Sequence, residues 1–257
     1  MIGLSTYAFF WQHSPRVAEP LTVERMLEST IALGADAFQI CDHPEVTGFG
    51  EARLDALAAR SRAAGVALEL GTRGTAVAHL DTYLRIAKRL GARLVRTMVT
   101  GPAAFDDLVA VLPRYAAAGV TVALETYERM PSADLVALVE RVDHPNLGIC
   151  LDPANCVAAL EHPDRVVDAA APHVVNLHVK DFAFTRDEGW VGFRLAGAPL
   201  GEGALDLDRL FARVRPAERG ISQIIEHWLP WQGDEAGTVA LERRWTEQNL
   251  AYLRRRA

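Results

Sequence analysis

The sequence has little cysteine and no long apolar run. Its three cysteines, Cys41, Cys150 and Cys156, are too few and too scattered for a disulfide framework, so we expect a cytoplasmic protein. No apolar stretch reaches the roughly 18 residues that cross a bilayer, so we expect no membrane partner. The first residues also lack the basic segment and apolar core that mark a secretory signal.

Basic residues are in the minority. The 257 residues include 27 Lys and Arg against 33 Asp and Glu, which gives a net charge of −6. Duplex nucleic-acid binders usually carry a basic face, so this balance argues against a nucleic-acid partner. Half of the residues are hydrophobic and 23% are charged, which excludes a disordered or low-complexity protein.

The chain alternates short apolar runs with longer amphipathic segments, and glycines follow several of the amphipathic segments. We expect strands near residues 2–6, 37–41, 66–70, 94–98, 120–124, 147–151, 174–179 and 221–225. Seven helices are expected near residues 23–33, 52–64, 77–90, 105–118, 133–142, 207–214 and 239–253, and an eighth, broken by Pro163, between the sixth and seventh strands.

Eight strand–helix units in this length predict an α/β fold, a closed parallel (β/α)8 barrel that forms a single domain over residues 1–257. A doubly wound open sheet is the competitor, but the Gly-x-Gly-x-x-Gly turn typical of it is missing after the first strand. One long loop is expected after the seventh strand, over residues 182–204, either as a lid or binding loop or as a packed excursion.

Polar residues end four consecutive predicted strands. Glu125, Asp152, His178 and Glu226 each come directly after an apolar residue at a strand end. In a parallel barrel the active site lies at the carboxyl ends of the strands, so these four side chains should converge. Three carboxylates brought together repel one another unless a cation compensates them. The pattern therefore predicts one divalent metal ion, and the oxygen-rich ligand set suits Mn²⁺, Mg²⁺ or Co²⁺ better than Zn²⁺.

Cationic residues also lie near the strand ends. Arg73 follows the third strand, Arg96 lies near the end of the fourth, and Lys180 has the same strand parity as His178. A buried cation needs an anion, so we expect at least one of these residues to contact an anionic substrate through its carboxylate or phosphate. The alternative is that Arg96 or Lys180 pairs inside the barrel with Glu69 or Asp181.

Further polar contacts are expected at the mouth of the barrel. Gln39, Asp42 and His43 lie near the end of the second strand, and we assign His43 to substrate binding, with an exposed loop histidine as the alternative. Asn155, three residues after the sixth strand's Asp152, is also assigned to substrate binding.

Three motifs carry a resemblance to a known family: His178-Val179-Lys180-Asp181, then Gly201-Glu202-Gly203-Ala204-Leu205-Asp206, and Glu226. In these motifs the chain resembles the xylose-isomerase-like superfamily of sugar isomerases, epimerases and lyases, which share the eightfold barrel. The resemblance implies that Glu125, Asp152, His178 and Glu226 bind one divalent metal ion.

Within this superfamily the segments Ile2–Trp11 and Leu68–Gly74 are similar to 3-oxo-isoapionate decarboxylases. Ketose 3-epimerases usually carry a His where this chain has Asn155 and an Arg where it has Phe184. The resemblance therefore implies a metal-dependent lyase of carbohydrate catabolism. We expect it to decarboxylate a 3-oxo sugar acid through a metal-stabilised enediolate, because loss of CO₂ needs a fixed carboxylate and an electron sink.

Three alternatives stay open. A sugar isomerase or ketose 3-epimerase, similar to hydroxypyruvate isomerase, would use Glu125 or Glu226 as the base. In the decarboxylation, Arg73, Arg96 or Lys180 would hold the carboxylate, and we assign Lys180 to catalysis together with Glu125 and Glu226. A DNA-repair endonuclease of this superfamily would need more histidine and acidic ligands for several zinc ions. A non-catalytic accessory subunit is the non-enzyme alternative. The protein could form a homo-oligomer under each of these hypotheses.

Overall fold

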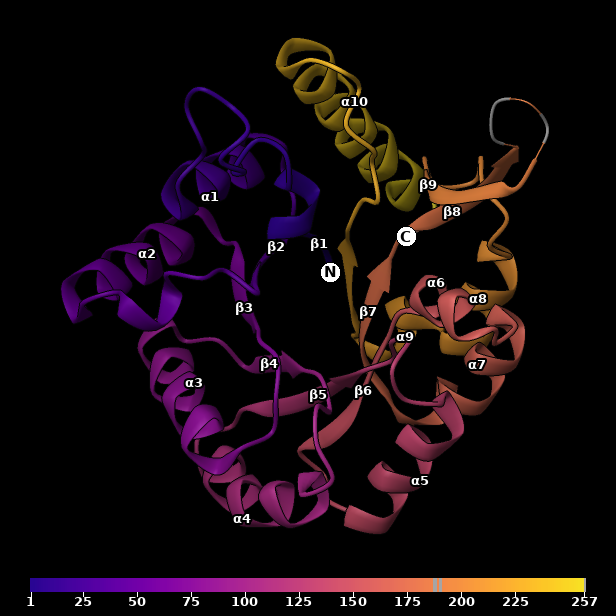
Figure 1. The fold of residues 1–257 in the computed structure, drawn as a ribbon. Helices are drawn as coiled ribbons and strands as arrows, with labels where there is room; N and C mark the ends of the chain where they lie inside the picture. Colours follow the sequence, from indigo (N-terminus) through magenta and orange to yellow (C-terminus); the bar gives the residue numbers. More distant parts are fainter. Residues whose placement is uncertain (187–188, 190, 257) are drawn as a thin grey trace.

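The computed structural model describes residues 1–186, 189 and 191–256, and within them eight parallel strands close into a barrel (Figure 1). Successive strands are neighbours except that β7 is followed by β10, which closes the barrel on β1. The barrel strands are β1 (Ile2–Ser5), β2 (Ala37–Cys41), β3 (Ala67–Gly71), β4 (Leu94–Thr97), β5 (Thr121–Glu125), β6 (Leu147–Leu151), β7 (Val174–Val179) and β10 (Ser222–Ile225). The predicted (β/α)8 barrel is confirmed.

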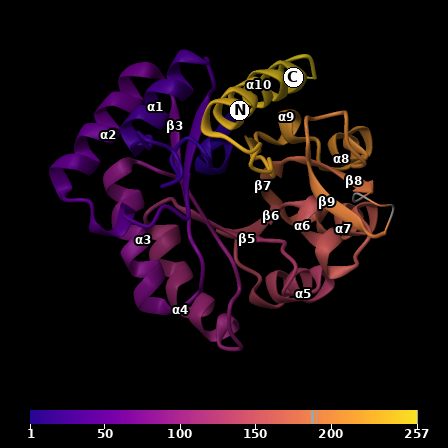
Figure 2. The same ribbon diagram turned by 45° about the horizontal axis from the view of Figure 1, so that its top comes forward.

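Helices surround the barrel on its outer side (Figure 2). The longer ones are α1 (Val23–Ala32), α2 (Glu51–Ala64), α3 (Val77–Leu90), α4 (Ala104–Ala117), α5 (Ser132–Val142), α7 (Pro163–Ala170), α8 (Leu207–Val214) and α10 (Glu235–Arg254). Short segments are η1 (Thr6–Phe9), η2 (Val46–Gly48), α6 (Pro153–Cys156), η3 (Val157–Ala159), η4 (Ala171–His173) and α9 (Pro216–Arg219). Gly65 and Gly91 end α2 and α3 at φ of 70° and 72°, a left-handed conformation that glycine adopts without strain.

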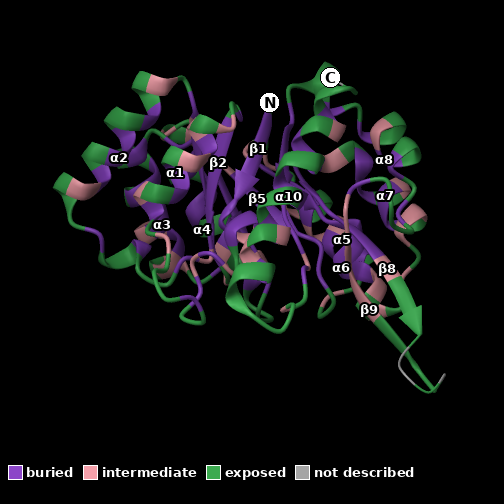
Figure 3. Cartoon of the chain, turned by 90° about the horizontal axis from the view of Figure 1, so that it is seen from above, coloured by how far each residue is buried: buried purple, intermediate pink, exposed green. Residues whose placement is uncertain are grey.

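Strand register decides which side chains enter the barrel. Asn176 pairs with Ser222 and His178 with Ile224, so the intervening Leu177 faces the helices. The outward side chains pack against the helical layer, and the strands are the most deeply buried part of the chain (Figure 3). Inward positions therefore hold the polar residues that end the strands.

The segment predicted as one long loop contains a β-hairpin, so that prediction is wrong in detail. β8 (Asp181–Arg186) pairs antiparallel with β9 (Phe193–Ala198), and the hairpin projects from the barrel end (Figure 3). Its two strands pair with each other and not with a barrel strand, and they are largely exposed or half-buried, so they lack the burial of the barrel strands. Trp190, assigned to this loop, lies outside the described residues.

Helix α10 is fastened to the segment after η1 by a buried carboxylate. Glu242, which is inaccessible to solvent, accepts hydrogen bonds from the backbone nitrogens of Trp11 (2.8 Å) and Gln12 (3.1 Å). Burial raises the pKa of Glu242 from its usual 4.5 to about 7. Among the described residues, no helix combines the length and the apolarity that spanning a bilayer would require.

We expect the carboxyl group of Glu242 to make the free energy of unfolding depend on pH. Between pH 4.5 and 7 the folded chain holds a proton at Glu242 that the unfolded chain has released, so the free energy of unfolding falls as pH rises through this window. The loss amounts to about 3 kcal/mol and is complete above pH 7. Glu242→Gln should remove this fall in the free energy of unfolding. Thermal unfolding of both proteins at pH 5 and 8 measures the difference, with the exposed Glu247→Gln on the same helix as control. Parallel pH profiles for all three proteins would contradict the prediction.

Candidate active site

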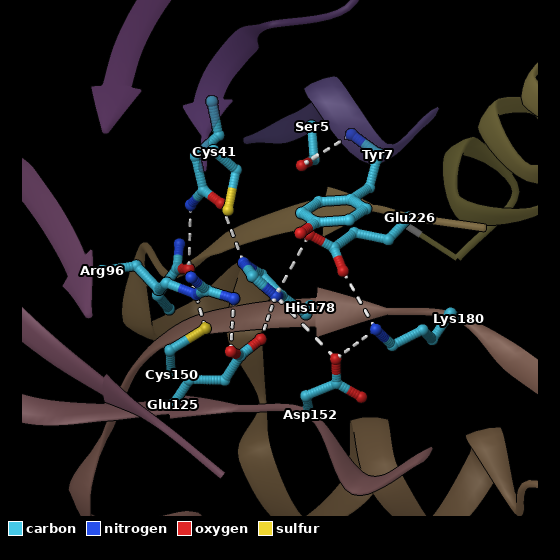
Figure 4. A network of polar contacts seen from close by, with 12 residues as sticks. Ser5, Tyr7, Cys41, Arg96, Glu125, Cys150, Asp152, His178, Lys180 and Glu226 are labelled. Atoms are coloured by element: carbon cyan, nitrogen blue, oxygen red, sulfur yellow. Dashed lines mark hydrogen bonds and ion pairs between the residues drawn. The ribbon is translucent and has the colours of Figure 1, made fainter. Parts of the chain in front are cut away.

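The carboxyl ends of β5, β6, β7 and β10 bring together the four residues predicted from the strand ends. Glu125, Asp152, His178 and Glu226 offer ligand atoms that all lie within 4.8 Å of one another. All four residues are buried, and their side chains point toward a common centre (Figure 4). The geometry is that of a single small cluster rather than of four separate strand-end caps.

The donor set fits a divalent cation. Nδ1 of His178 lies 2.9 Å from Oε1 of Glu125, 3.4 Å from Oε1 of Glu226 and 3.8 Å from Oδ2 of Asp152. Oε1 of Glu226 is buried and accepts no hydrogen bond from any residue that the structure describes, whereas Oε2 of Glu125 and Oδ2 of Asp152 are paired with the cations Arg96 and Lys180. Three buried carboxylates and one imidazole gathered in this way are suited to a metal ion of the hard, oxygen-binding kind.

Lys180 compensates part of the negative charge. Its Nζ lies 2.7 Å from Oδ2 of Asp152 and 3.0 Å from Oε2 of Glu226. Burial raises the pKa of Asp152 to about 6. Burial also opposes ionisation of Glu226, but His178 and Lys180 outweigh it and lower the pKa of Glu226 to about 2. The neighbouring carboxylates keep the pKa of Lys180 above its usual value despite burial, so Lys180 is a cation here.

A second charged group lies beside the cluster, at the ends of β2, β3 and β4. Asp42 accepts hydrogen bonds from Nε of Arg73 (3.0 Å) and from Nη1 of Arg96 (3.1 Å). Tyr7 donates its hydroxyl to Asp42 (3.1 Å) and accepts from Nη2 of Arg73 (2.8 Å). Arg96 also pairs with Glu125, which links this group to the cluster. Asp42 therefore holds two arginines in fixed positions.

The backbone at Asp42 is unusual. Its φ is 51°, in the left-handed region that few residues other than glycine, Asn and Asp adopt. The sequence predicted Asp42 only as a polar contact, and its position directly after a strand was the available signal. Neither Arg96 nor Lys180 takes Glu69 or Asp181 as its ion-pair partner, so the alternative pairing inside the barrel is wrong.

These residues line a cavity of about 810 Å³ at the mouth of the barrel. The predicted site residues on its wall are Arg73, Arg96, Glu125, Asn155, Lys180 and Glu226. Asp152 and His178 lie beneath the wall and are fully buried. Trp228 was not predicted; Nζ of Lys180 lies 4.8 Å from the centre of its ring. Trp228 shares the inward parity of Glu226, two residues earlier, and that parity would have identified it.

His43 is not among the described residues that line this cavity. It is buried and packs beside His13 and Phe49, with ring centres 5.9 and 6.1 Å away. Asp42 turns the chain through its left-handed conformation, and the next side chain is directed into aromatic packing. The structure therefore gives the predicted substrate contact of His43 no support, and it also makes the exposed-histidine alternative wrong.

Comparison with known proteins agrees with this architecture. A model of the xylose isomerase-like TIM barrel family matches residues 27–256. The 3-oxo-isoapionate decarboxylase of Pectobacterium atrosepticum is 50% identical over 259 residues, which cover 98% of this chain and 94% of the relative.

Solved structures share the fold at low identity. A D-psicose 3-epimerase crystallised in the presence of D-fructose is 14% identical, with a TM-score of 0.74 and 98% of each chain covered. A xylose isomerase-like TIM barrel protein from Mycobacterium smegmatis, solved in complex with magnesium, is 17% identical, with a TM-score of 0.69 and 97% of each chain covered. Since the family model matches most of the chain and a relative of 50% identity spans nearly all of it, the chain belongs to the xylose isomerase-like TIM barrel family.

Proposed function

We propose that this protein is a divalent-metal-dependent lyase that decarboxylates a 3-oxo sugar acid, with 3-oxo-isoapionate as the substrate to test first. The observation that carries the proposal is the 50% identity to a 3-oxo-isoapionate decarboxylase over 98% of the chain. The charged cavity supports it, because fixed arginines can hold the substrate carboxylate, and a divalent cation held by the carboxylate-rich cluster would be the electron sink.

The residues that would hold the metal ion are Glu125, Asp152, His178 and Glu226. A bound divalent cation supplies Lewis-acid stabilisation of negative charge on a substrate oxygen. Mn²⁺, Mg²⁺ and Co²⁺ are the candidates that suit three carboxylates and one imidazole. The three cysteines are free and buried, which supports the expected cytoplasmic location.

The remaining residues perform the steps that involve the protein itself. Arg73 lies on the cavity wall with its guanidinium fixed by Asp42 and Tyr7, and we assign it to the substrate carboxylate. When the bond to the carboxyl carbon breaks, CO₂ leaves and its bonding electron pair moves toward the oxo group. Lys180, a cation on the cavity wall, is placed to deliver the proton that the remaining carbon takes up, and it recovers a proton from solvent.

An isomerase or ketose 3-epimerase is the second candidate. Glu125 and Glu226 favour it, because both carboxylates reach the cavity and could exchange a proton with a substrate carbon. The two reactions differ in the bond that breaks, carbon–carbon in the first and carbon–hydrogen in the second.

Release of CO₂ separates the two candidates. The purified metal-loaded protein is incubated with 3-oxo-isoapionate in D₂O, and with neutral ketoses in parallel. The proposal expects stoichiometric CO₂ from the acid and no deuterium in recovered ketose. Deuterium in recovered ketose without CO₂ from any 3-oxo acid would replace the lyase with the isomerase.

Arg73→Gln tests the assigned carboxylate contact. A charge-assisted hydrogen bond contributes about 1.5–3 kcal/mol, so KM for the acidic substrate should rise about 10- to 100-fold. Inhibition by a neutral ketose should change less than about twofold, because that ligand has no carboxylate. Steady-state kinetics measure both values, and Arg62→Gln on the exposed face of α2 is the matched control. An equal loss toward both ligands would remove Arg73 from carboxylate recognition.

A further inference from the structure

A chain of buried amides lies directly beneath the metal cluster. Nε2 of His178, the ring nitrogen that faces away from the carboxylates, lies 2.8 Å from Oε1 of Gln39. Both residues are completely buried, His178 on β7 and Gln39 across the barrel on β2. This contact requires a proton on Nε2 of the imidazole, because an amide oxygen can only accept a hydrogen bond.

The orientation of the Gln39 amide is fixed by its other neighbours. Nε2 of Gln39 donates to Oε2 of Glu69 (3.0 Å) and to Oδ1 of Asn176 (3.2 Å). Reversing the amide would turn its oxygen toward these two acceptors and its nitrogen toward His178. The reversal would lose the two hydrogen bonds to Glu69 and Asn176 in the dry interior of the barrel, where unpaired polar groups are costly.

Asn176 is itself held in one orientation. Its Nδ2 donates to Oε2 of Glu69 (3.1 Å) and to Oγ of Ser222 (2.7 Å). Its Oδ1 accepts from Sγ of Cys150 (3.1 Å) as well as from Gln39. Oε2 of Glu69 thus accepts hydrogen bonds from both amides, and these bonds fix which end of each amide is its nitrogen.

We propose that Gln39 is a positioning residue that holds the ring of His178 in one orientation through Nε2, and that Glu69 anchors Gln39 in turn. Nε2 then carries the proton that it donates to Gln39, and Nδ1 faces Glu125, Asp152 and Glu226, the side on which a divalent cation would be bound. The inference rests on the metal centre proposed above, and it assigns a role to residues that touch neither the cavity nor the cation. Partners of this kind typically change metal affinity by 10- to 100-fold.

Gln39→Leu tests the proposal, since it removes the acceptor with little change in volume. Calorimetric titration of the metal-free protein with Mn²⁺ should show binding weaker by about 10- to 100-fold. Gln223→Leu is the matched control: Gln223 is also buried on a barrel strand, but it pairs with Leu177 and faces the helices. Its Mn²⁺ affinity should stay within about twofold of the parent protein.

A measurement on the metal-free protein tests the contact between Gln39 and His178 independently of metal binding. Nitrogen-15 NMR of the metal-free protein at neutral pH should show a proton on Nε2 of His178 that exchanges slowly with solvent because Gln39 accepts it, and this exchange should become faster in Gln39→Leu. If the parent protein binds no Mn²⁺ but shows the slowly exchanging Nε2 proton, the metal centre fails and the contact between Gln39 and His178 stands. If Nε2 of His178 carries no proton in the parent protein, the proposed role of Gln39 is wrong.

An exchange of the two side chains provides a rescue. Gln39→Glu alone places two carboxyl groups side by side and should weaken Mn²⁺ binding. Gln39→Glu combined with Glu69→Gln restores one carboxylate and one amide, and leaves an acceptor opposite His178. The double variant should bind Mn²⁺ at least about tenfold more tightly than Gln39→Glu alone. A merely structural role of the two residues would not produce this recovery. Additive losses would overturn the inference.

Discussion

Asp152→Asn should lower the affinity for Mn²⁺ by more than about 100-fold, because loss of a direct ligand exceeds the 10- to 100-fold effect of outer partners. The substitution is conservative in shape. Oδ1 of Asp152 accepts from the backbone nitrogen of Asn155 (3.3 Å) at the start of α6, and an asparagine oxygen preserves this cap. The change falls on Oδ2, which lies 2.7 Å from Nζ of Lys180 and 3.8 Å from Nδ1 of His178.

The metal-free variant should remain folded. Burial raises the pKa of Asp152 to about 6, so above that pH its ionised form lowers the stability of the metal-free protein, and the amide relieves this effect. We expect an unfolding midpoint equal to or above that of the metal-free parent. Added Mn²⁺ should raise the midpoint of the parent but not of the variant.

Elemental analysis after dialysis and CO₂ release complete the test. Asp168→Asn is the control, because Asp168 pairs with Arg209 and Arg213 on the surface between α7 and α8. A dialysed Asp152→Asn protein that keeps one metal ion per chain and full turnover would contradict the assignment of this cluster.

The cluster could be predicted because it depends on position along the strand alone. Glu125, Asp152, His178 and Glu226 follow directly on apolar strands, and a parallel barrel brings all strand ends to one face. Arg73, Arg96 and Lys180 reached the same cavity for the same reason.

Features that depend on side-chain partners across the barrel could not be predicted. The position of Asp42 directly after a strand predicted a polar contact, but its pairing with Arg73 and Arg96 depends on how three strand ends meet in the closed barrel. Gln39 and Asn176 are 137 residues apart, and only the closed barrel brings their amides together. The hairpin was read as a loop because its strands pair with each other and lack the apolar run of a barrel strand.

Asp181→Asn should be among the most destabilising single substitutions in the chain. Asp181 is buried at the start of β8, and its carboxylate accepts four backbone hydrogen bonds. Oδ1 accepts from the nitrogens of Phe182 (2.8 Å) and Leu205 (3.0 Å), and Oδ2 from those of Gly201 and Gly203 (3.0 Å each). The two sequence motifs His178–Asp181 and Gly201–Asp206 are thus one structural unit, in which a carboxylate fastens the chain that returns from the hairpin.

An asparagine would turn an NH₂ group toward two N–H donors, and leaving such donors unpaired costs about 1–3 kcal/mol each. We expect a loss of about 3 kcal/mol or more, or roughly 6–12 °C in the unfolding midpoint for a chain of this size. Gly203→Ala should act at the same point, because its Cβ would lie 2.1 Å from Oδ1 of Asp181 and 2.5 Å from the carbonyl oxygen of Phe182.

Thermal unfolding and Mn²⁺ titration together distinguish an anchor from a ligand. Asp206→Asn is the matched control in the same motif, since Asp206 caps α8 through Arg209 and asparagine caps a helix equally well. We expect Asp181→Asn to keep Mn²⁺ affinity within about threefold below its unfolding midpoint, because the cluster and Lys180 stand on β5, β6, β7 and β10 and on the residues that directly follow them. An unchanged midpoint with lost Mn²⁺ binding would assign Asp181 to the metal centre instead of to the return of the chain.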